Sequence, residues 1–117
     1  MSGISELRIE ARTVPQAAII ALHGDLSADG DAAIKDAYHD AATNGPGVVL
    51  FNLAETQYIN TSGISVLISV AMEAKQQGVT MVVAGASPHY RKVLDLVRFS
   101  TFVSMYDDEA TALASLA

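Results

Sequence analysis

The sequence contains no cysteine and few basic residues, with seven Lys and Arg against 13 Asp and Glu. The absence of cysteine excludes disulfide bonds, thiolate catalysis and thiolate-ligated metals, and it fits a reducing compartment. We therefore expect a cytoplasmic protein. Because binding to phosphates needs clustered basic residues, the scattered Lys and Arg and a formal charge of −6 argue against a nucleic-acid partner.

The sequence also lacks an apolar run long enough to cross a membrane, because Ser65, Ser69 and Glu73 interrupt its most apolar segment. Its first residues carry no basic region ahead of an apolar one, so we expect neither an export signal nor direct membrane insertion. Half of the 117 residues are apolar, which excludes disorder for the chain as a whole. A chain of this length predicts one domain over residues 1–117 with a sizeable hydrophobic core.

The first part of the chain predicts an edge hairpin followed by a helix. Residues 7–13 alternate between apolar and polar, as in a half-exposed strand, and residues 17–22 form an apolar run of strand length. Residues 24–27 then end this second strand, and Asp29 and Asp31 favour a helix start. Residues 44–47 stop that helix, with Gly45 available for a left-handed cap. The apolar stripe of the helix is Ile34, Ala37, Tyr38 and Ala41.

The rest of the chain continues this alternation. Residues 48–51 form a buried strand, a polar loop leads to Ile59, and the next helix covers residues 63–77. A strand at 80–85 and a helix beginning at Ser87-Pro88 follow, before a short strand at 102–106 and a last helix. The stripe of the third helix is Tyr90, Val93, Leu94 and Val97, and that of the last is Ala110, Leu113 and Leu116. Strand, helix and strand in succession favour parallel pairing with right-handed crossovers. The pattern predicts an α/β fold, with a mixed central sheet of about five strands and about four helices packed against it.

Two adjacent hydroxyl residues, Thr61 and Ser62, precede the helix that we expect to begin at Gly63. Hydroxyl side chains commonly cap helix amides, and the residues alone favour this structural role. A phosphate at the same place would bring about −1.5 to −2 charges to the positive end of a helix, where the fold can accept them. The corner is therefore also a candidate phosphorylation site.

The helix after this corner has two apolar stripes. Ile64, Leu67, Ile68, Ala71 and Met72 are expected to face the sheet. The second stripe contains Val66 and Val70, with Ser62, Ser69 and Glu73 beside them. If it is exposed, this stripe is a docking surface for another protein; alternatively, another element of the fold covers Val66 and Val70.

Residues 52–64, with Asn52-Leu53 and then Tyr58-Ile59-Asn60-Thr61-Ser62-Gly63-Ile64, resemble the signature of STAS domains, the family of bacterial anti-sigma factor antagonists. The resemblance extends to Gly24-Asp25-Leu26, to Ala86-Ser87-Pro88 and to the last third of the chain. It covers essentially the full length and implies the STAS fold.

The resemblance implies a regulatory protein-binding module rather than an enzyme, with no cofactor and no metal. Its partner is expected to be an anti-sigma factor that is also a serine/threonine kinase of histidine-kinase-like fold. By position, Thr61 is the phosphoacceptor, with Ser62 as second choice and Asn60 and Gly63 flanking it. The dephosphorylated form would bind the anti-sigma factor, and phosphorylation would release it. The expected partner-binding residues are Ser62, Ser65, Val66, Ser69, Val70, Glu73 and Asp25.

Asn60 stands where the family signature has Asp, so the position next to the acceptor lacks a carboxylate. The Thr61-Ser62 pair is also similar to the stressosome branch of the family. An alternative function is therefore a non-phosphorylated adaptor, either in a stressosome or as the soluble subunit of a lipid-transport complex. The sequence leaves the oligomeric state open.

The remaining polar residues do not form a recognisable active site. His23 lies beside Asp25, but this pair lacks the third group and the pocket that acid–base catalysis requires. His39 and His89 fall on expected helices without further ligands at metal-binding spacing. Gly24 and Gly30 are separated by acidic residues, which would repel a phosphate.

Overall fold

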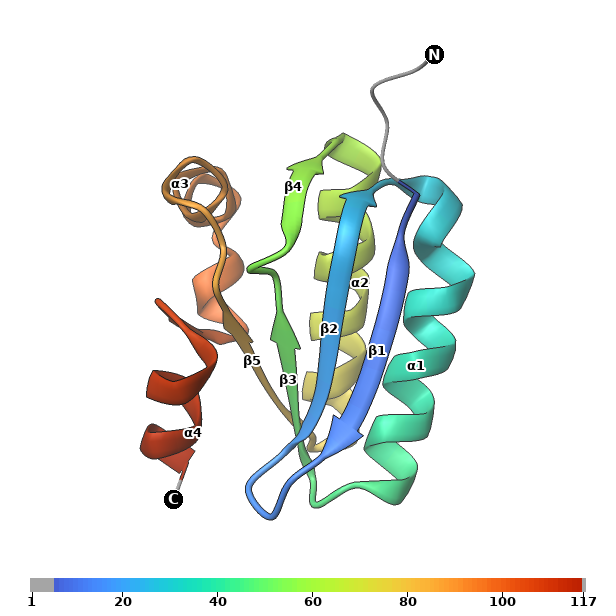
Figure 1. Ribbon diagram of the computed structural model, residues 1–117, viewed down its shortest axis with the longest axis vertical. Coiled ribbons are helices and arrows are strands. Elements are labelled where there is room, and N and C mark those ends of the chain that lie inside the picture. Colours follow the sequence, from blue (N-terminus) through green and yellow to red (C-terminus); the bar gives the residue numbers. More distant parts are fainter. Residues whose placement is uncertain (1–5, 117) are drawn as a thin grey trace.

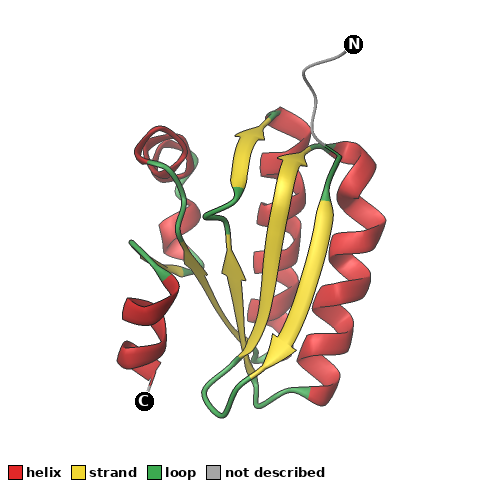
Figure 2. Ribbon diagram, viewed as in Figure 1, coloured by secondary structure: helices red, strands yellow, loops and turns green. Residues whose placement is uncertain are grey.

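The computed structural model describes residues 6–116, which form a mixed sheet with helices on both faces (Figures 1 and 2). In chain order the elements are β1 (Arg8–Thr13), β2 (Ala18–Leu26), the short 3-10 turn η1 (Ala28–Gly30), α1 (Asp31–Asn44), β3 (Val48–Asn52), β4 (Thr56–Ile59), α2 (Thr61–Gln77), β5 (Thr80–Ala84), α3 (Pro88–Leu96), the 3-10 turn η2 (Phe99–Thr101), β6 (Ser104–Tyr106) and α4 (Glu109–Leu116). The expected α/β fold with a mixed central sheet is confirmed.

The strands are ordered β1-β2-β3-β5-β6. β1 runs antiparallel to β2, as the predicted hairpin requires, and the pairs β2–β3, β3–β5 and β5–β6 are parallel. In Figure 1, α1 and α2 lie behind the sheet. The strand order therefore follows from a hairpin at one edge and helical crossovers between the parallel strands.

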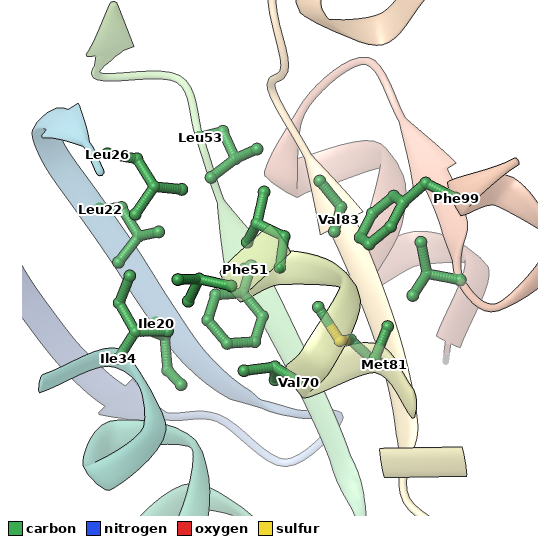
Figure 3. Close-up of a cluster of buried hydrophobic side chains, with 14 of the residues drawn as sticks. Ile20, Leu22, Leu26, Ile34, Phe51, Leu53, Val70, Met81, Val83 and Phe99 are labelled. Atoms are coloured by element: carbon green, nitrogen blue, oxygen red, sulfur yellow. The ribbon is translucent and has the colours of Figure 1, made fainter. Parts of the chain in front are cut away.

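The larger core fills the space between the sheet and helices α1, α2 and α3. Phe51 of β3 is fully buried there, together with Leu22 of β2, Tyr38 of α1 and Val70 of α2. Figure 3 shows side chains of the neighbouring strands and helices gathered around Phe51. Because β3 is central and covered on both faces, its sequence is a continuous apolar run rather than an alternating one.

A smaller core lies on the opposite face, where Ile19, Leu50 and Val82 pack with Ala112 of α4. The predicted apolar face of this last helix is partly wrong, because Ala110 is exposed and Ala112 is buried. The helix begins at Glu109, and the carboxylate of Asp108 accepts a hydrogen bond of 2.7 Å from the Thr111 amide. Hydrogen bonds from Thr111 hold the pKa of Asp108 below its ordinary value.

One prediction around β2 is wrong. The strand ends at Leu26, within the segment expected to end it and beyond the end of β3. This overhang pairs in parallel with residues 56–59, which form β4 instead of the expected loop. Gly24 aligns with Thr56, and Leu26 aligns with Ile59. Residues 56–59 form a strand because the end of β2 lies beside them.

Two predictions at the helix ends are also wrong, while the start of α3 is confirmed. Gly45 has an extended backbone, and Gly47 takes the positive φ of 90° instead. The Ala41 carbonyl oxygen would lie 2.5 Å from a Cβ at Gly45, so close backbone contact explains the glycine. Ser87 accepts a hydrogen bond of 3.2 Å from the Tyr90 amide, as expected of a cap before Pro88. Val97 is exposed, because α3 ends at Leu96.

Candidate functional site

The candidate site is the corner between β4 and α2, which the overhanging end of β2 holds in place. The backbone amide of Asn60 donates a 3.1 Å hydrogen bond to the carbonyl oxygen of Leu26. Ile59, the residue before Asn60, is the strand partner of Leu26 and is buried. The first turn of α2 is therefore attached to the end of a central strand by both backbone and side-chain contacts.

Asn60 is the N-cap of α2. Its Oδ1 accepts a 2.8 Å hydrogen bond from the Gly63 amide, and its carbonyl oxygen accepts one of 3.0 Å from the Ile64 amide. The helix consequently begins at Thr61 rather than at Gly63, and the expectation that Thr61 and Ser62 precede and cap it is wrong. Both residues lie within the first turn and are exposed. An asparagine side chain caps as well as a hydroxyl, which leaves the hydroxyl groups of Thr61 and Ser62 free of this task.

Gly63 allows α2 to approach the backbone of β2. A Cβ at this position would lie 2.4 Å from the Leu26 carbonyl oxygen and 3.0 Å from Cγ2 of Ile59. Backbone atoms cannot move aside as a flexible side chain can. The glycine beside the hydroxyl pair is therefore a packing requirement, which brings the start of the helix against the end of the strand.

A groove of about 940 Å³ adjoins this corner. Asn60 and Tyr58 line one side of it, and Asp25 and Asp29 belong to the same lining. Tyr58 is 55% exposed although it is a large aromatic residue. The structure thus brings Asp25, one of the predicted partner-binding residues, into a groove next to Asn60, and it adds Tyr58, which the sequence analysis did not single out.

The faces of α2 differ from the prediction. Val66 and Val70 are 6% and 0% exposed, so the fold itself covers them, and they cannot form an exposed docking stripe. Met72, expected to face the sheet, is 46% exposed. The buried residues recur at spacings of three and four, and they are Gly63, Val66, Leu67, Val70, Ala71 and Ala74. The outward face instead carries Ser65 and Met72, with Ser69 partly exposed between them.

Glu73 lies at the contact between α2 and α1. Its carboxylate pairs with the imidazole of His39 and accepts a 3.1 Å hydrogen bond from Nε2 of Gln77. The hydroxyl of Tyr38 donates to Oε1 of Gln77 at 2.7 Å. Burial, and secondarily the negative charge of Glu73, raise the pKa of the Tyr38 hydroxyl. Glu73 therefore has an intramolecular structural role in addition to its predicted place beside a docking surface.

The comparison with protein families decides what kind of domain carries this corner. The model of the STAS domain matches residues 8–112, which is nearly the whole chain. The chain belongs to the STAS domain family. The corner at Asn60 lies within the matched residues.

Solved structures of other proteins share the fold of this STAS domain. An anti-sigma factor antagonist from Mycobacterium paratuberculosis gives a TM-score of 0.81 at 14% identity, with 95% of this chain and 94% of that one covered. The Bacillus cell fate determinant SpoIIAA in its phosphorylated form gives 0.72 at 17% identity, covering 96% and 100%. A sulfate transporter family protein from Wolinella succinogenes gives 0.76 at 17% identity, covering 90% and 88%. No curated protein sequence matches this chain.

None of the helices in the described part of the chain has the length and apolar character needed to cross a membrane. Within residues 6–116, no three His, Asp or Glu side chains converge in a way that could hold a metal ion.

The cap of this STAS domain gives a stability prediction. Asn60→Ala removes the acceptor of the Gly63 amide, and we expect it to lower the free energy of unfolding by about 1 kcal/mol. Asn60→Asp keeps an acceptor and adds a negative charge at the positive end of α2, so it should be neutral or slightly stabilising. Urea unfolding followed by circular dichroism measures both variants. Equal losses in the two variants would contradict the capping role.

Proposed function

We propose that this STAS domain is an anti-sigma factor antagonist of bacterial partner switching, controlled by phosphorylation of Thr61. Its partner is a cytoplasmic anti-sigma factor with serine/threonine kinase activity and a histidine-kinase-like fold. The family membership and the similarity to anti-sigma factor antagonist structures support this function. In this scheme the domain is a substrate and a ligand, and the catalytic groups belong to the kinase.

The observation that carries the proposal is the exposed first turn of α2. Asn60 supplies the cap, so a phosphate on Thr61 would not break the bond that starts the helix. The phosphate would add about −1.5 to −2 charges beside the unpaired amides of a helix N-terminus, which favours negative charge. Ser62 is also exposed and is the second choice of acceptor. Phosphorylation of either residue in this first turn changes the charge of the surface while leaving the fold intact.

The docking surface that we propose extends from this corner along the outward face of α2. Ser65 and Ser69 remain part of it, and Met72 takes the place of Val66 and Val70, because the two valines are buried. Asp25 in the neighbouring groove is the part of the surface that lies outside the helix. A partner that covers this area would lie directly over Thr61. A phosphate at that point would have to be desolvated on binding, which disfavours the complex.

Incubation with the candidate anti-sigma kinase and ATP tests the acceptor. We expect intact-mass analysis to show addition of one phosphate to the wild-type chain and to Ser62→Ala, and none to Thr61→Ala. Ser62→Ala is the matched control, since both residues are exposed and neighbouring hydroxyls of the same turn. A phosphate retained in Thr61→Ala would move the assignment to another residue, and no addition to the wild type would remove the switch.

A non-phosphorylated adaptor is the second candidate function, either in a stressosome or in a lipid-transport complex. The observation in its favour is Asn60, whose side chain already accepts the Gly63 amide and places no carboxylate beside Thr61. The similarity to a sulfate transporter family protein shows that this fold also occurs in transport-related proteins. Stable partner binding that ATP and the kinase leave unchanged would support the adaptor and contradict the switch.

A further inference from the structure

The outer edge of β1 is an exposed strand edge. β1 is the first strand in the sheet order, so one side of it pairs with β2 and the other faces outward. Figure 1 shows it as the outermost strand, with α1 beside and behind it. All of its residues are exposed except the half-buried Ile9. An exposed strand edge can extend its sheet by pairing with another strand.

The residues along this edge alternate in both polarity and charge. Arg8, Glu10 and Arg12 align with His23, Ala21 and Ile19 of β2, which places the three charged residues on one face of the sheet. Glu6, two residues before Arg8, continues the same alternation. Leu7 and Ile9 belong to the opposite face, where they pack against the larger core. The strand therefore presents a charged row of alternating sign beside an apolar row.

We propose that β1 pairs antiparallel with β1 of a second copy of this chain, around a two-fold axis at Ile9. In this register Arg8 lies opposite Glu10 of the second copy, and Glu10 opposite its Arg8. Glu6 and Arg12 form the same complementary pair farther out. Opposite charges across neighbouring antiparallel strands stabilise the pairing. The charged row is thus self-complementary, and the two sheets join into one.

The charge pattern also selects this register over the next ones. A shift of the axis to Glu10 places Arg8 opposite Arg12 and Glu10 opposite itself, and a shift to Arg8 places Arg8 opposite itself. Like charges directly opposite each other are destabilising. Charged side chains on an edge strand usually oppose pairing with another strand. Because the charges of β1 alternate in sign, the register around Ile9 pairs opposite charges instead.

The seam between β1 and α1 leaves space beside the proposed contact. One end of this seam belongs to the groove lined by Leu7, Ile9 and Ala33. Farther along, a hollow of about 170 Å³ is lined by Ala11 and by Ala37 of α1. Ala33 and Ala37 of α1 have small side chains, so α1 leaves space along the edge of β1. The apolar row of a second β1 has room to pack in this space.

The present ion pairs are compatible with this contact. Arg12 pairs with Glu109, and Glu10 pairs with His23; Arg12 and Glu10 are largely exposed, whereas Glu109 and His23 are mostly covered. Arg8 makes no ion pair within the described part of the chain. In the proposed dimer, Arg8 gains an ion pair with Glu10 of the second copy. Exchanging the charges at these two positions therefore tests the contact.

Sedimentation equilibrium of the full chain at low salt tests the proposal. We expect a mass approaching twice 12.3 kDa with rising concentration, and weaker association at high salt, where exposed ion pairs are screened. Arg8→Glu alone and Glu10→Arg alone each place like charges opposite one another twice. Each should raise the dimer dissociation constant by about tenfold or more, with the wild-type circular dichroism spectrum retained.

Mixing the two single variants provides the decisive control. A chain with Arg8→Glu and a chain with Glu10→Arg are complementary to each other at both inner positions, so the mixture should form a heterodimer with near wild-type affinity. The double variant Arg8→Glu/Glu10→Arg should dimerise with itself for the same reason. A monomeric wild-type chain, dimers that persist in either single variant, or a mixture that does not associate would each overturn the proposal.

Discussion

Gly63→Ala is expected to lower the free energy of unfolding by about 3 kcal/mol, although alanine normally favours a helix over glycine. The new Cβ would lie 2.4 Å from the Leu26 carbonyl oxygen, so α2 would have to move away from β2. Such a movement also strains the hydrogen bond between the Asn60 amide and the same carbonyl oxygen. Urea unfolding monitored by circular dichroism gives the loss directly.

Gly78→Ala is the matched control at the other end of α2. Gly78 has a φ of 72°, and no atom lies within 4 Å of an added Cβ. The left-handed conformation alone therefore sets its cost, which should be about 1 kcal/mol. A Gly63→Ala chain as stable as the wild type, or less affected than Gly78→Ala, would contradict the close approach of α2 to β2.

Thr61→Glu is expected to weaken binding to the anti-sigma kinase by about a hundredfold, because it places an unpaired negative charge under the docked partner. The same charge stands at the positive end of α2, so the free energy of unfolding should stay the same or rise by about 0.5 kcal/mol. The affinity for the kinase therefore falls while the free energy of unfolding stays the same or rises. Isothermal titration calorimetry and thermal unfolding of the same preparation measure the two effects.

Thr61→Gln separates charge from size in this experiment. Glutamine has nearly the shape of glutamate without its charge, so most of the binding should remain. If Thr61→Gln loses as much affinity as Thr61→Glu, steric contact rather than charge controls the complex. Parallel losses of affinity and stability in Thr61→Glu would indicate a structural role for Thr61 and would contradict the proposed switch.

Much of the fold could be predicted because local patterns agree with long-range packing. The apolar run that ends at Leu22, the stop signals around Pro46 and the Ser87-Pro88 helix start each have one dominant physical cause. β4 could not be predicted in the same way. Within residues 6–116 its strand partner is the overhang of β2, and nothing within residues 56–59 reveals that Leu26 lies beside Ile59.

The corner shows the same division between local and long-range information. Asparagine, serine and threonine have similar capping tendencies, so residues 60–62 alone do not determine which one caps α2. The contact of the Asn60 amide with Leu26 decides it. By contrast, the burial of Val66 and Val70 was present in the sequence, because Gly63, Leu67, Ala71 and Ala74 repeat with them at helical spacing. The predicted helix, which begins at Gly63 and has Ile64 and Met72 facing the sheet, turns Val66 and Val70 to the side instead.

The overhang of β2 determines what kind of signal the proposed phosphorylation switch could send. The carbonyl oxygen of Leu26 accepts the hydrogen bond from the Asn60 backbone amide and also lies against Gly63. These two contacts hold the first turn of α2 against rotation and unwinding. A group attached to Thr61 would therefore leave the backbone where it is. The modified and unmodified proteins would share one shape, and a partner would distinguish them by electrostatic potential alone. Such a signal needs no conformational relay, and high ionic strength would weaken it.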